Sequence, residues 1–171
     1  MRVFILTLLV ALPNILLAQA DILKPQSDLI GTQINALSFT DYIQNEPVSR
    51  DFSGKLKVLE FWATWCKPCL KAVPHMNYLH RKFKDQNVVF LSVTYQKPEE
   101  TKRTLEKVNF ETIVVSDQTR ELHRNLNIEV NGYMPIPRTV LIDSENRIVW
   151  YGSPKELTEE IIEMFLNRQK K

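Results

Sequence analysis

Three mostly apolar runs of strand length mark the middle of the chain. They cover residues 55–63 (KLKVLEFWA), 87–95 (NVVFLSVTY) and 112–117 (TIVVSD). Runs of this length and composition, without regular alternation of apolar and polar positions, are typical of strands buried on both faces. The first run contains one acid, Glu60, which the strand pattern does not explain.

Residues between and after these runs have the period of helices. Residues 67–84 place apolar side chains three or four apart, which predicts one buried helix face; these side chains are Leu70, Val73, Met76, Leu79 and Phe83. Residues 97–109 predict a charged helix with a proline and two acids at its start, where the helix dipole favours them. Residues 119–128 predict a short helix, and residues 154–171 a terminal amphipathic helix.

The remaining segments complete a mixed sheet. Residues 138–143 and 146–152 flank a polar turn and predict a hairpin. Residues 29–54 predict short strands or turns that cover one edge. Strands that alternate with helices and end in a hairpin indicate the α/β class, with helices on both sides of the sheet. The length of 171 residues suits a single domain.

The first twenty residues form a separate segment. Arg2 precedes an apolar stretch that Pro13 and Asn14 interrupt, and Ala18 and Ala20 are the small residues that a signal peptidase reads. A membrane span needs about 20 unbroken apolar residues, so the pattern favours a cleaved secretory signal. An uncleaved membrane anchor is the alternative. A polar, flexible segment is expected over residues 21–28.

Composition excludes some classes of function. The formal net charge is +2, and acids and bases are mixed along the chain. Nothing resembles the basic stripe of a nucleic-acid-binding protein, so no nucleic-acid partner is expected.

The chain has two cysteines, Cys66 and Cys69. Export would allow a disulfide. However, closing so short a loop removes little entropy from the unfolded chain, so a purely structural role is a poor explanation. A zinc site needs about four ligands, and His75, His80 and His123 show no matching spacing. His75 and His80 are expected on a solvated helix face.

The position of the pair favours redox chemistry instead. Cys66 is expected at the start of the helix over residues 67–84, where unpaired N–H groups, the helix dipole and Lys67 favour a thiolate. Thiol groups of C-x-x-C pairs in such positions have pKa values of about 3.5–7.5. Cys69, one turn further on, could attack a mixed disulfide formed by Cys66. Pro68 stiffens the turn, and Trp62 and Trp65 are expected to form an apolar collar. A peroxidase cysteine is disfavoured, because Thr64 precedes it without the matching proline.

FWATWCKPC (residues 61–69) resembles the thioredoxin active site, and residues 29–168 resemble the exported TlpA/ResA-like branch of thioredoxin-fold thiol–disulfide oxidoreductases. Pro74 matches the proline that kinks the first helix of that fold. IPRTVLID (residues 136–143) matches the cis-proline segment, which makes Pro137, rather than Pro135, the expected cis residue. Ile136 would then offer backbone hydrogen bonds to an extended substrate.

The resemblance also implies a layout. It predicts a thioredoxin domain over residues 29–168 with an N-terminal extension, a family-type insertion between the C-x-x-C helix and the cis-proline strand, and a basic tail over residues 169–171. It further implies a monomer that needs no cofactor besides its own redox-active disulfide.

Glu60 gains a role from the same comparison. It lies six residues before Cys66, where thioredoxins place a buried acid, and on the same strand face as Trp62. Burial would raise its pKa, because desolvation disfavours the charged form. The hypothesis is that Glu60 takes the proton from Cys69 as that thiol attacks. The alternative is a carboxylate that reaches solvent or a lysine at the sheet edge.

The resemblance implies an exported reductant. Cys66, Cys69, Glu60 and Pro137 would form the catalytic set, and the substrate contacts would come from Trp65, Lys67, Pro68 and Ile136. Expected partners are exported protein disulfides, including apocytochromes during cytochrome c maturation, and a membrane electron donor. Ala72 stands where some ResA-like proteins carry an acid, so their substrate preference does not transfer directly. An oxidant or isomerase, and a binding module or metal chaperone on the same fold, remain as alternatives.

Overall fold

The computed structural model describes residues 26, 28–39 and 41–169. The expected signal segment lies outside the described residues, as do most of residues 21–28 and residues 170–171 of the expected basic tail. Gln26 is buried and its side-chain amide donates a hydrogen bond to the carbonyl of Asn127, 3.0 Å away.

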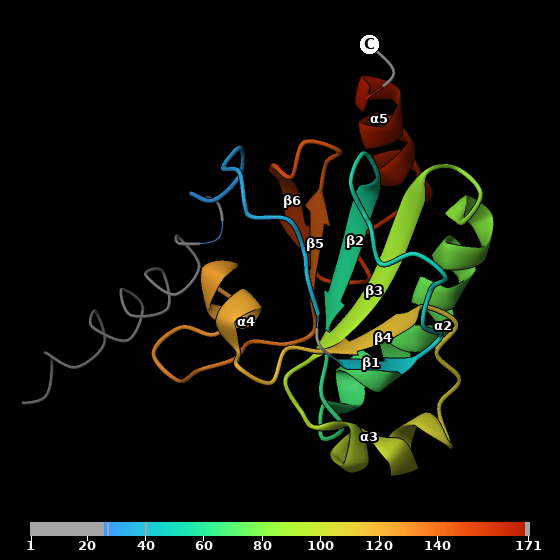
Figure 1. Ribbon diagram of the computed structural model, residues 1–171, viewed down its shortest axis with the longest axis vertical. Helices are drawn as coiled ribbons and strands as arrows, with labels where there is room; N and C mark the ends of the chain where they lie inside the picture. Colours follow the sequence, from blue (N-terminus) through green and yellow to red (C-terminus); the bar gives the residue numbers. More distant parts are fainter. Residues whose placement is uncertain (1–25, 27, 40, 170–171) are drawn as a thin grey trace, which may run out of the picture.

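One six-stranded mixed sheet, in the order β1-β4-β3-β2-β5-β6, forms the centre of the described residues (Figure 1). β2 pairs in parallel with β3 and antiparallel with β5, so its backbone is hydrogen-bonded on both sides. β1 lies at the edge next to β4, as expected for the segment before residue 55. The strands are β1 (Asp41–Gln44), β2 (Leu56–Phe61), β3 (Val88–Thr94), β4 (Ile113–Ser116), β5 (Arg138–Ile142) and β6 (Ile148–Gly152).

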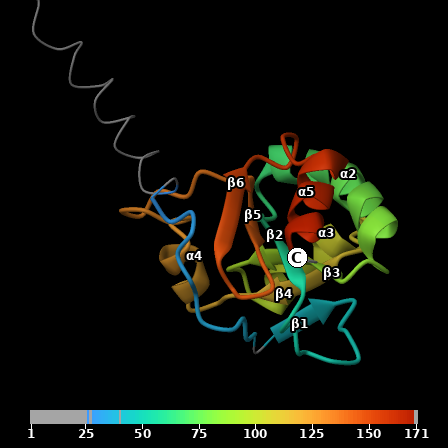
Figure 2. The same cartoon turned by 90° about the horizontal axis from the view of Figure 1, so that it is seen from above.

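Helices cover both faces of this sheet, as the sequence predicts (Figures 1 and 2). One face carries α2, α3 and α5, and the other carries α4 and the chain before β1. The helices are α2 (Lys67–Phe83), α3 (Pro98–Leu105), α4 (Glu121–Asn125) and α5 (Glu159–Gln169). α3, α4 and α5 are shorter than expected, because turns replace the ends of the predicted segments.

The residues of β2 explain its central place. All six are buried, and successive side chains point to opposite faces of the sheet. Leu56 and Val58 pack with α2 and α5, whereas Leu59 and Phe61 pack with the core on the α4 side. A strand buried on both faces must be apolar almost throughout, and residues 55–63 have this pattern.

Lys57 is an exception within this strand that the sequence pattern did not explain. Its side chain is 1% exposed, and its ammonium donates hydrogen bonds to the carbonyl of Asp143 (2.9 Å) and to Oδ1 of Asn146 (2.8 Å). Both acceptors lie in the turn between β5 and β6, so a buried cation ties the central strand to the terminal hairpin.

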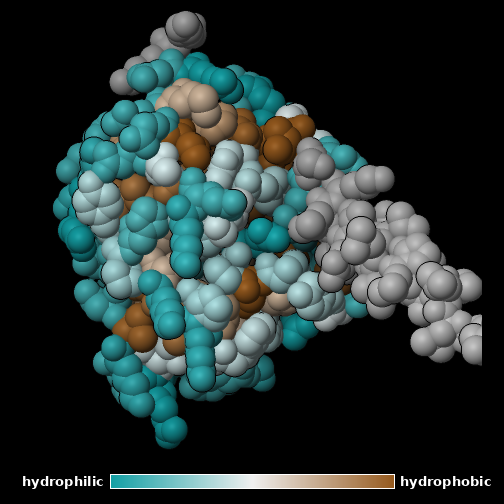
Figure 3. All heavy atoms as spheres, turned by 180° about the vertical axis from the view of Figure 1, so that it is seen from behind, coloured by the Kyte–Doolittle hydropathy of each residue, from teal (hydrophilic) through white to brown (hydrophobic). Residues whose placement is uncertain are grey.

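Hydrophilic residues cover most of the face seen in Figure 3, and hydrophobic residues show there in small separate groups. Within the part of the chain that the structure describes, no helix is both long and apolar enough to cross a membrane.

Candidate active site

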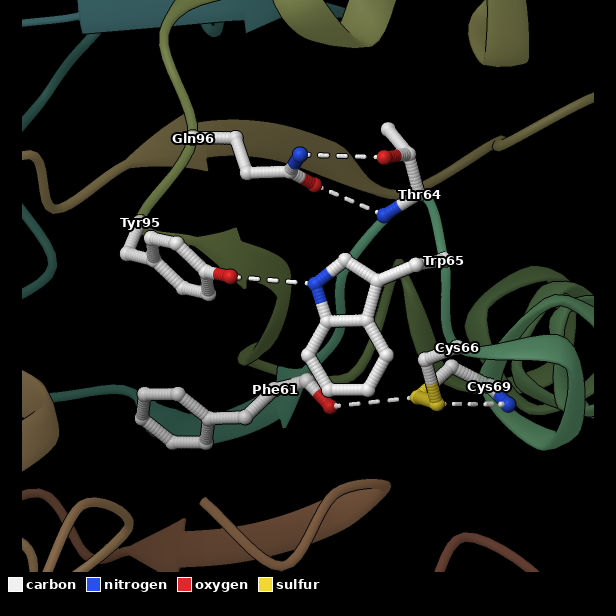
Figure 4. Close-up of a disulfide and its surroundings, with 7 residues drawn as sticks. All are labelled: Phe61, Thr64, Trp65, Cys66, Cys69, Tyr95 and Gln96. Carbon is white, nitrogen blue, oxygen red and sulfur yellow. Dashed lines mark hydrogen bonds between the residues drawn. A yellow bond between two sulfur atoms is a disulfide. The ribbon is translucent and has the colours of Figure 1, made fainter. Parts of the chain in front are cut away.

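Cys66 and Cys69 form a disulfide at the start of α2 (Figure 4). Cys66 is the N-cap residue of the helix, and its sulfur accepts a hydrogen bond from the backbone N–H of Cys69 at 3.2 Å. The N–H groups at a helix start have no partner within the helix, so a sulfur in this place satisfies one of them and would be stabilised as a thiolate. Cys66 is therefore where the sequence predicts it.

The surroundings of the pair are mostly apolar. Cys66 is 3% exposed and Cys69 is fully buried, in a cluster with Trp62 and Val73. The sulfur of Cys69 lies 4.0 Å from the carbonyl oxygen of Phe61, the last residue of β2. Both cysteines are therefore buried in the oxidised form, Cys69 slightly deeper than Cys66.

The two tryptophans have different environments. Trp65 is 58% exposed beside the disulfide, as an aromatic collar requires. Trp62 is fully buried in the same cluster as the cysteines, and its ring packs 4.7 Å from that of Phe110. Trp65 is therefore an exposed aromatic surface beside the disulfide, whereas Trp62 packs behind the disulfide in the core.

Lys67 and Pro68 occupy the first turn of α2, and both are exposed. That turn contains no acid. Pro74 lies inside the helix, as the resemblance implies, and Ala72 is buried. The exposed first turn therefore offers a cation and a rigid ring beside Cys66.

The peptide bond between Ile136 and Pro137 is cis, which confirms the choice of Pro137 over Pro135. Ile136 packs against the cluster that holds both cysteines, so the cis-proline loop lies beside the disulfide. The N–H of Ile136 donates to the carbonyl of Met134 at 3.0 Å. Strand addition through this N–H would require that internal bond to open.

Glu60 is buried in the middle of β2 and is 1% exposed. Burial raises the pKa of its carboxyl group to about 8, although the hydroxyl of Ser92, which donates to Oε2 at 3.2 Å, opposes the shift. The raised pKa confirms the expectation from the sequence. The alternative, a carboxylate that reaches solvent or a lysine at the edge, does not fit this degree of burial.

The neighbours of Glu60 on adjacent strands are polar but uncharged. Ser92 is its partner on β3 and Thr139 its partner on β5. Ser92 also shares a 2.7 Å hydrogen bond with Thr112. Within the described residues, Oε1 of Glu60 is buried without a hydrogen-bond partner, which disfavours the charged form further.

Sequence reasoning missed two residues that contact the C-x-x-C segment from the loop after β3. The hydroxyl of Tyr95 accepts a hydrogen bond from the indole N–H of Trp65 at 3.0 Å (Figure 4). The side chain of Gln96 accepts from the N–H of Thr64 at 2.7 Å and donates to its hydroxyl at 3.0 Å. No local motif marks these residues; only the pairing of β2 with β3 brings them to the site.

The histidines differ from the expectation. His75 and His80 are half-buried rather than solvated, because α2 turns them toward other elements. The ring nitrogen Nε2 of His75 lies 2.9 Å from the carbonyl of Leu157, and burial against Phe90 lowers the pKa of His80. His123 is fully buried and bonded to Asp117. Among the residues that the structure describes, no three His, Cys, Asp or Glu side chains gather as a metal site would need.

The geometry and the comparisons agree on the class of protein. The family model for the AhpC/TSA family matches residues 30–151, and the chain belongs to this family. Its fold is the thioredoxin fold, and it is a thiol–disulfide oxidoreductase of the TlpA/ResA-like type.

Individual relatives agree with this assignment. The chain is 29% identical over 168 residues to the thiol-disulfide oxidoreductase ResA of Bacillus thuringiensis subsp. konkukian, an alignment that covers 98% of this chain and 94% of that protein. A solved structure from Chlorobium tepidum, described as a candidate thiol:disulfide interchange protein DsbE, has a TM-score of 0.59 and 26% identity over 67% of this chain and 82% of its own. The thioredoxin domain of a Bacteroides vulgatus thiol-disulfide oxidoreductase shares the fold, with a TM-score of 0.62 and 24% identity over 81% of this chain and 98% of its own.

Proposed function

We propose that the chain is an exported reductant of protein disulfides. The observation that carries the proposal is the Cys66–Cys69 disulfide at the start of α2, beside the cis peptide bond before Pro137. A helix start stabilises a thiolate, and a cis-proline loop presents backbone to an extended polypeptide. Both features suit exchange with a disulfide in another protein.

The reaction begins from the dithiol form. The Cys66 thiolate attacks one sulfur of the partner disulfide, and the other partner sulfur leaves as a thiolate that takes up a proton. Cys69 then loses its proton and attacks the sulfur of Cys66, which releases the second partner thiolate. Two electrons have moved to the partner, and Cys66 and Cys69 are left as the disulfide.

We assign Glu60 the proton of Cys69 in the second step. A carboxyl group with a pKa of about 8 can exchange a proton near neutral pH, unlike an exposed carboxylate. Its place on the face of β2 that packs against α2 supports this role. Trp65, Lys67, Pro68 and Ile136 would contact the partner around Cys66.

The direction of electron flow and the compartment rest on the sequence. Residues 1–20 have the pattern of a cleaved signal, which supports export, to the periplasm where the cell has one; an uncleaved anchor is the alternative. In either case a membrane electron donor would regenerate the dithiol, and exported proteins such as apocytochromes in cytochrome c maturation would be the substrates. A monomer suffices for this reaction, since both cysteines belong to one chain.

Insulin reduction tests the enzyme directly. The reduced full-length chain should precipitate insulin B chains with dithiothreitol as electron source, and Cys66→Ser should abolish this turnover. Cys69→Ser should instead trap a mixed disulfide with the substrate. Absence of turnover, or turnover that survives Cys66→Ser, would favour a binding module or metal chaperone on the same fold.

The direction of electron flow needs the redox potential of the Cys66–Cys69 couple. C-x-x-C proteins of this fold range from roughly −270 to −120 mV, and a reductant should lie toward the lower end. Equilibration with glutathione or dithiothreitol buffers measures it. A value near −120 mV would contradict the proposed direction and favour an oxidant or isomerase.

A further inference from the structure

The loop after β3 reaches the residues that precede Cys66. Its consecutive residues Tyr95 and Gln96 bond to the consecutive residues Trp65 and Thr64, through three hydrogen bonds of 2.7 to 3.0 Å. Figure 4 shows both side chains directed at the segment that leads into the disulfide. This pair of residues, Tyr95 and Gln96, is called the clamp below.

Trp65 is an exposed side chain that is nevertheless held by a hydrogen bond. Its indole is 58% exposed, yet its single polar atom is held by a half-buried tyrosine. An exposed side chain normally samples several rotamers, and fixing one before binding reduces the entropy lost when a partner binds. The bond to Tyr95 thus fixes a large aromatic surface next to Cys66.

Tyr95 is itself held on two sides. The guanidinium carbon of Arg120 lies 4.3 Å from the centre of its ring, and the ring of His123 meets it edge-on at 5.9 Å. His123 is fixed in turn by the carboxylate of Asp117, 2.7 Å from its Nδ1. Arg120 has a left-handed backbone (φ 58°), which is unfavourable for a residue with a side chain. The base of the clamp is therefore built from α4 and the turn before it.

Gln96 is held equally well. The residue is buried, its backbone carbonyl accepts a hydrogen bond from the hydroxyl of Ser116 at 2.8 Å, and its N–H donates to the hydroxyl of Thr94 at 3.3 Å. The N–H and the hydroxyl of Thr64 are thus both fixed from the ends of β3 and β4. The clamp is therefore held firmly at the carboxyl end of β3, an inner strand of the sheet.

We propose that Tyr95, which bonds to the indole of Trp65, and Gln96, which fixes the preceding Thr64, are positioning residues that hold Trp65 as a preformed contact for polypeptide disulfides. The inference rests on the proposed function and adds a substrate class to it. A polypeptide extends past the reacting sulfurs and contacts Trp65, whereas a small disulfide reaches Cys66 without it. The clamp accordingly favours disulfides in proteins over small-molecule disulfides.

Tyr95→Phe tests the clamp, because it removes one hydroxyl and keeps the ring. We expect the ratio of the rates with insulin and with hydroxyethyl disulfide to fall about fivefold, the effect of one lost hydrogen bond, through a higher KM for insulin. Tyr78→Phe is the matched control, since Tyr78 bonds to Glu159 away from the disulfide. When Trp65 is already replaced by Phe, adding Tyr95→Phe should not change the ratio of the two rates any further, because the bond that it removes is already absent.

A spectroscopic readout separates positioning from general stability. The indole N–H resonance of Trp65, assigned by its loss in Trp65→Phe, should shift and become more mobile in Tyr95→Phe but not in Tyr78→Phe. If Tyr95→Phe does not fold, Gln96→Met, which removes both bonds to Thr64, carries the same rate test.

The outcomes separate the two proposals. A wild-type chain that reduces neither probe would overturn the proposed function. A wild-type chain that reduces both, with an unchanged ratio in Tyr95→Phe and Gln96→Met, would overturn the clamp and leave the proposed function standing.

Discussion

At the scale of the residue, Glu60 combines a charged side chain with a site that cannot solvate charge. It is 1% exposed, and the hydroxyl of Ser92 is the hydrogen-bond donor to its carboxylate. Its pKa of about 8 means that a minority of molecules carry the ionised, proton-accepting form at neutral pH. The rate of any step that needs this base should rise with pH through this value.

The first prediction concerns this base. Glu60→Gln should slow the resolution of a mixed disulfide on Cys66 by roughly 10- to 100-fold at about pH 8, as expected when a general base is lost. The wild-type rate should rise with an inflection near pH 8, and the variant should lack this inflection. Stopped-flow release of thionitrobenzoate from Cys66 measures the rate.

Two further variants sharpen this test. Ser92→Ala removes the donor that lowers the pKa of Glu60, so it should move the inflection to higher pH. Glu163→Gln, a change at an exposed acid on α5, is the control and should leave the profile as it is. The same rate and profile in Glu60→Gln as in the wild type would remove Glu60 from the proton transfer.

The sequence predicted the residues that lie within one local motif. Cys66, Cys69 and Glu60 belong to one strand and the helix that follows it, and Pro137 belongs to a segment with its own pattern. Tyr95 and Gln96 escaped because they lie 30 and 32 positions from the residues they contact. Such contacts depend on the register between strands, which a single sequence does not reveal.

At the scale of the element, α2 connects the core to the chemistry. Its buried face packs on the sheet, and its start places Cys66 where N–H groups are unpartnered. The apolar spacing predicted both the extent of this helix and its buried face. The sequence predicted α3, α4 and α5 to be longer than they are, since the ends of helices depend on contacts in the neighbouring turns. Ahead of α5, for example, the carboxylate of Glu156 accepts a hydrogen bond from the N–H of Ser153 at 2.6 Å.

The second prediction concerns the charge at the start of α2. Lys67→Glu places an acid beside Cys66 and should slow the alkylation of reduced Cys66 by iodoacetamide at neutral pH about two- to fivefold, because the thiolate is less favoured. Iodoacetamide is uncharged, so the effect reports the thiolate rather than the reagent. Lys71→Glu makes the same charge change one turn further along, at another exposed position.

Lys71→Glu should have a clearly smaller effect, because the influence of a helix terminus and of a neighbouring charge falls off within about one turn. Equal effects of the two substitutions would show that only the net charge of the chain matters. The local account of Cys66 would then be wrong.

At the scale of the whole molecule, the sequence predicted the fold class and the layers of helices and sheet, but not the buried hydrogen bonds that join distant segments. The alternation of apolar runs and helical segments predicted a mixed sheet with helices on both faces, which the structure confirms. Lys57 could not be placed from the pattern, since its acceptors lie 86 and 89 positions away in the β5–β6 turn. Buried polar residues are the points at which a hydrophobic pattern loses its predictive value.

The buried acid also links the stability of the whole fold to pH. The pKa of Glu60 is about 8 in the folded chain, against an ordinary value of 4.5, so folding favours the protonated form. This contribution is fully present below pH 4.5 and is lost by the time the pH has risen through 8, because between these values the unfolded chain is ionised at Glu60 while the folded chain stays protonated. The amide of the Glu60→Gln variant cannot ionise, so the free energy of unfolding of this variant does not fall for this reason.

The final prediction follows from this fall in the free energy of unfolding with rising pH. As the pH rises from about 4.5 to beyond 8, the free energy of unfolding of the oxidised wild type should fall, relative to that of oxidised Glu60→Gln, by on the order of a few kcal/mol. Urea unfolding of both proteins across this range measures the difference, and other titrating groups cancel because they are common to both. A difference that does not change with pH would mean that Glu60 is equally ionised in the folded and unfolded chains. In that case the pKa of Glu60 would be ordinary, and the inflection near pH 8 expected for the resolution of the mixed disulfide would have no source in this residue.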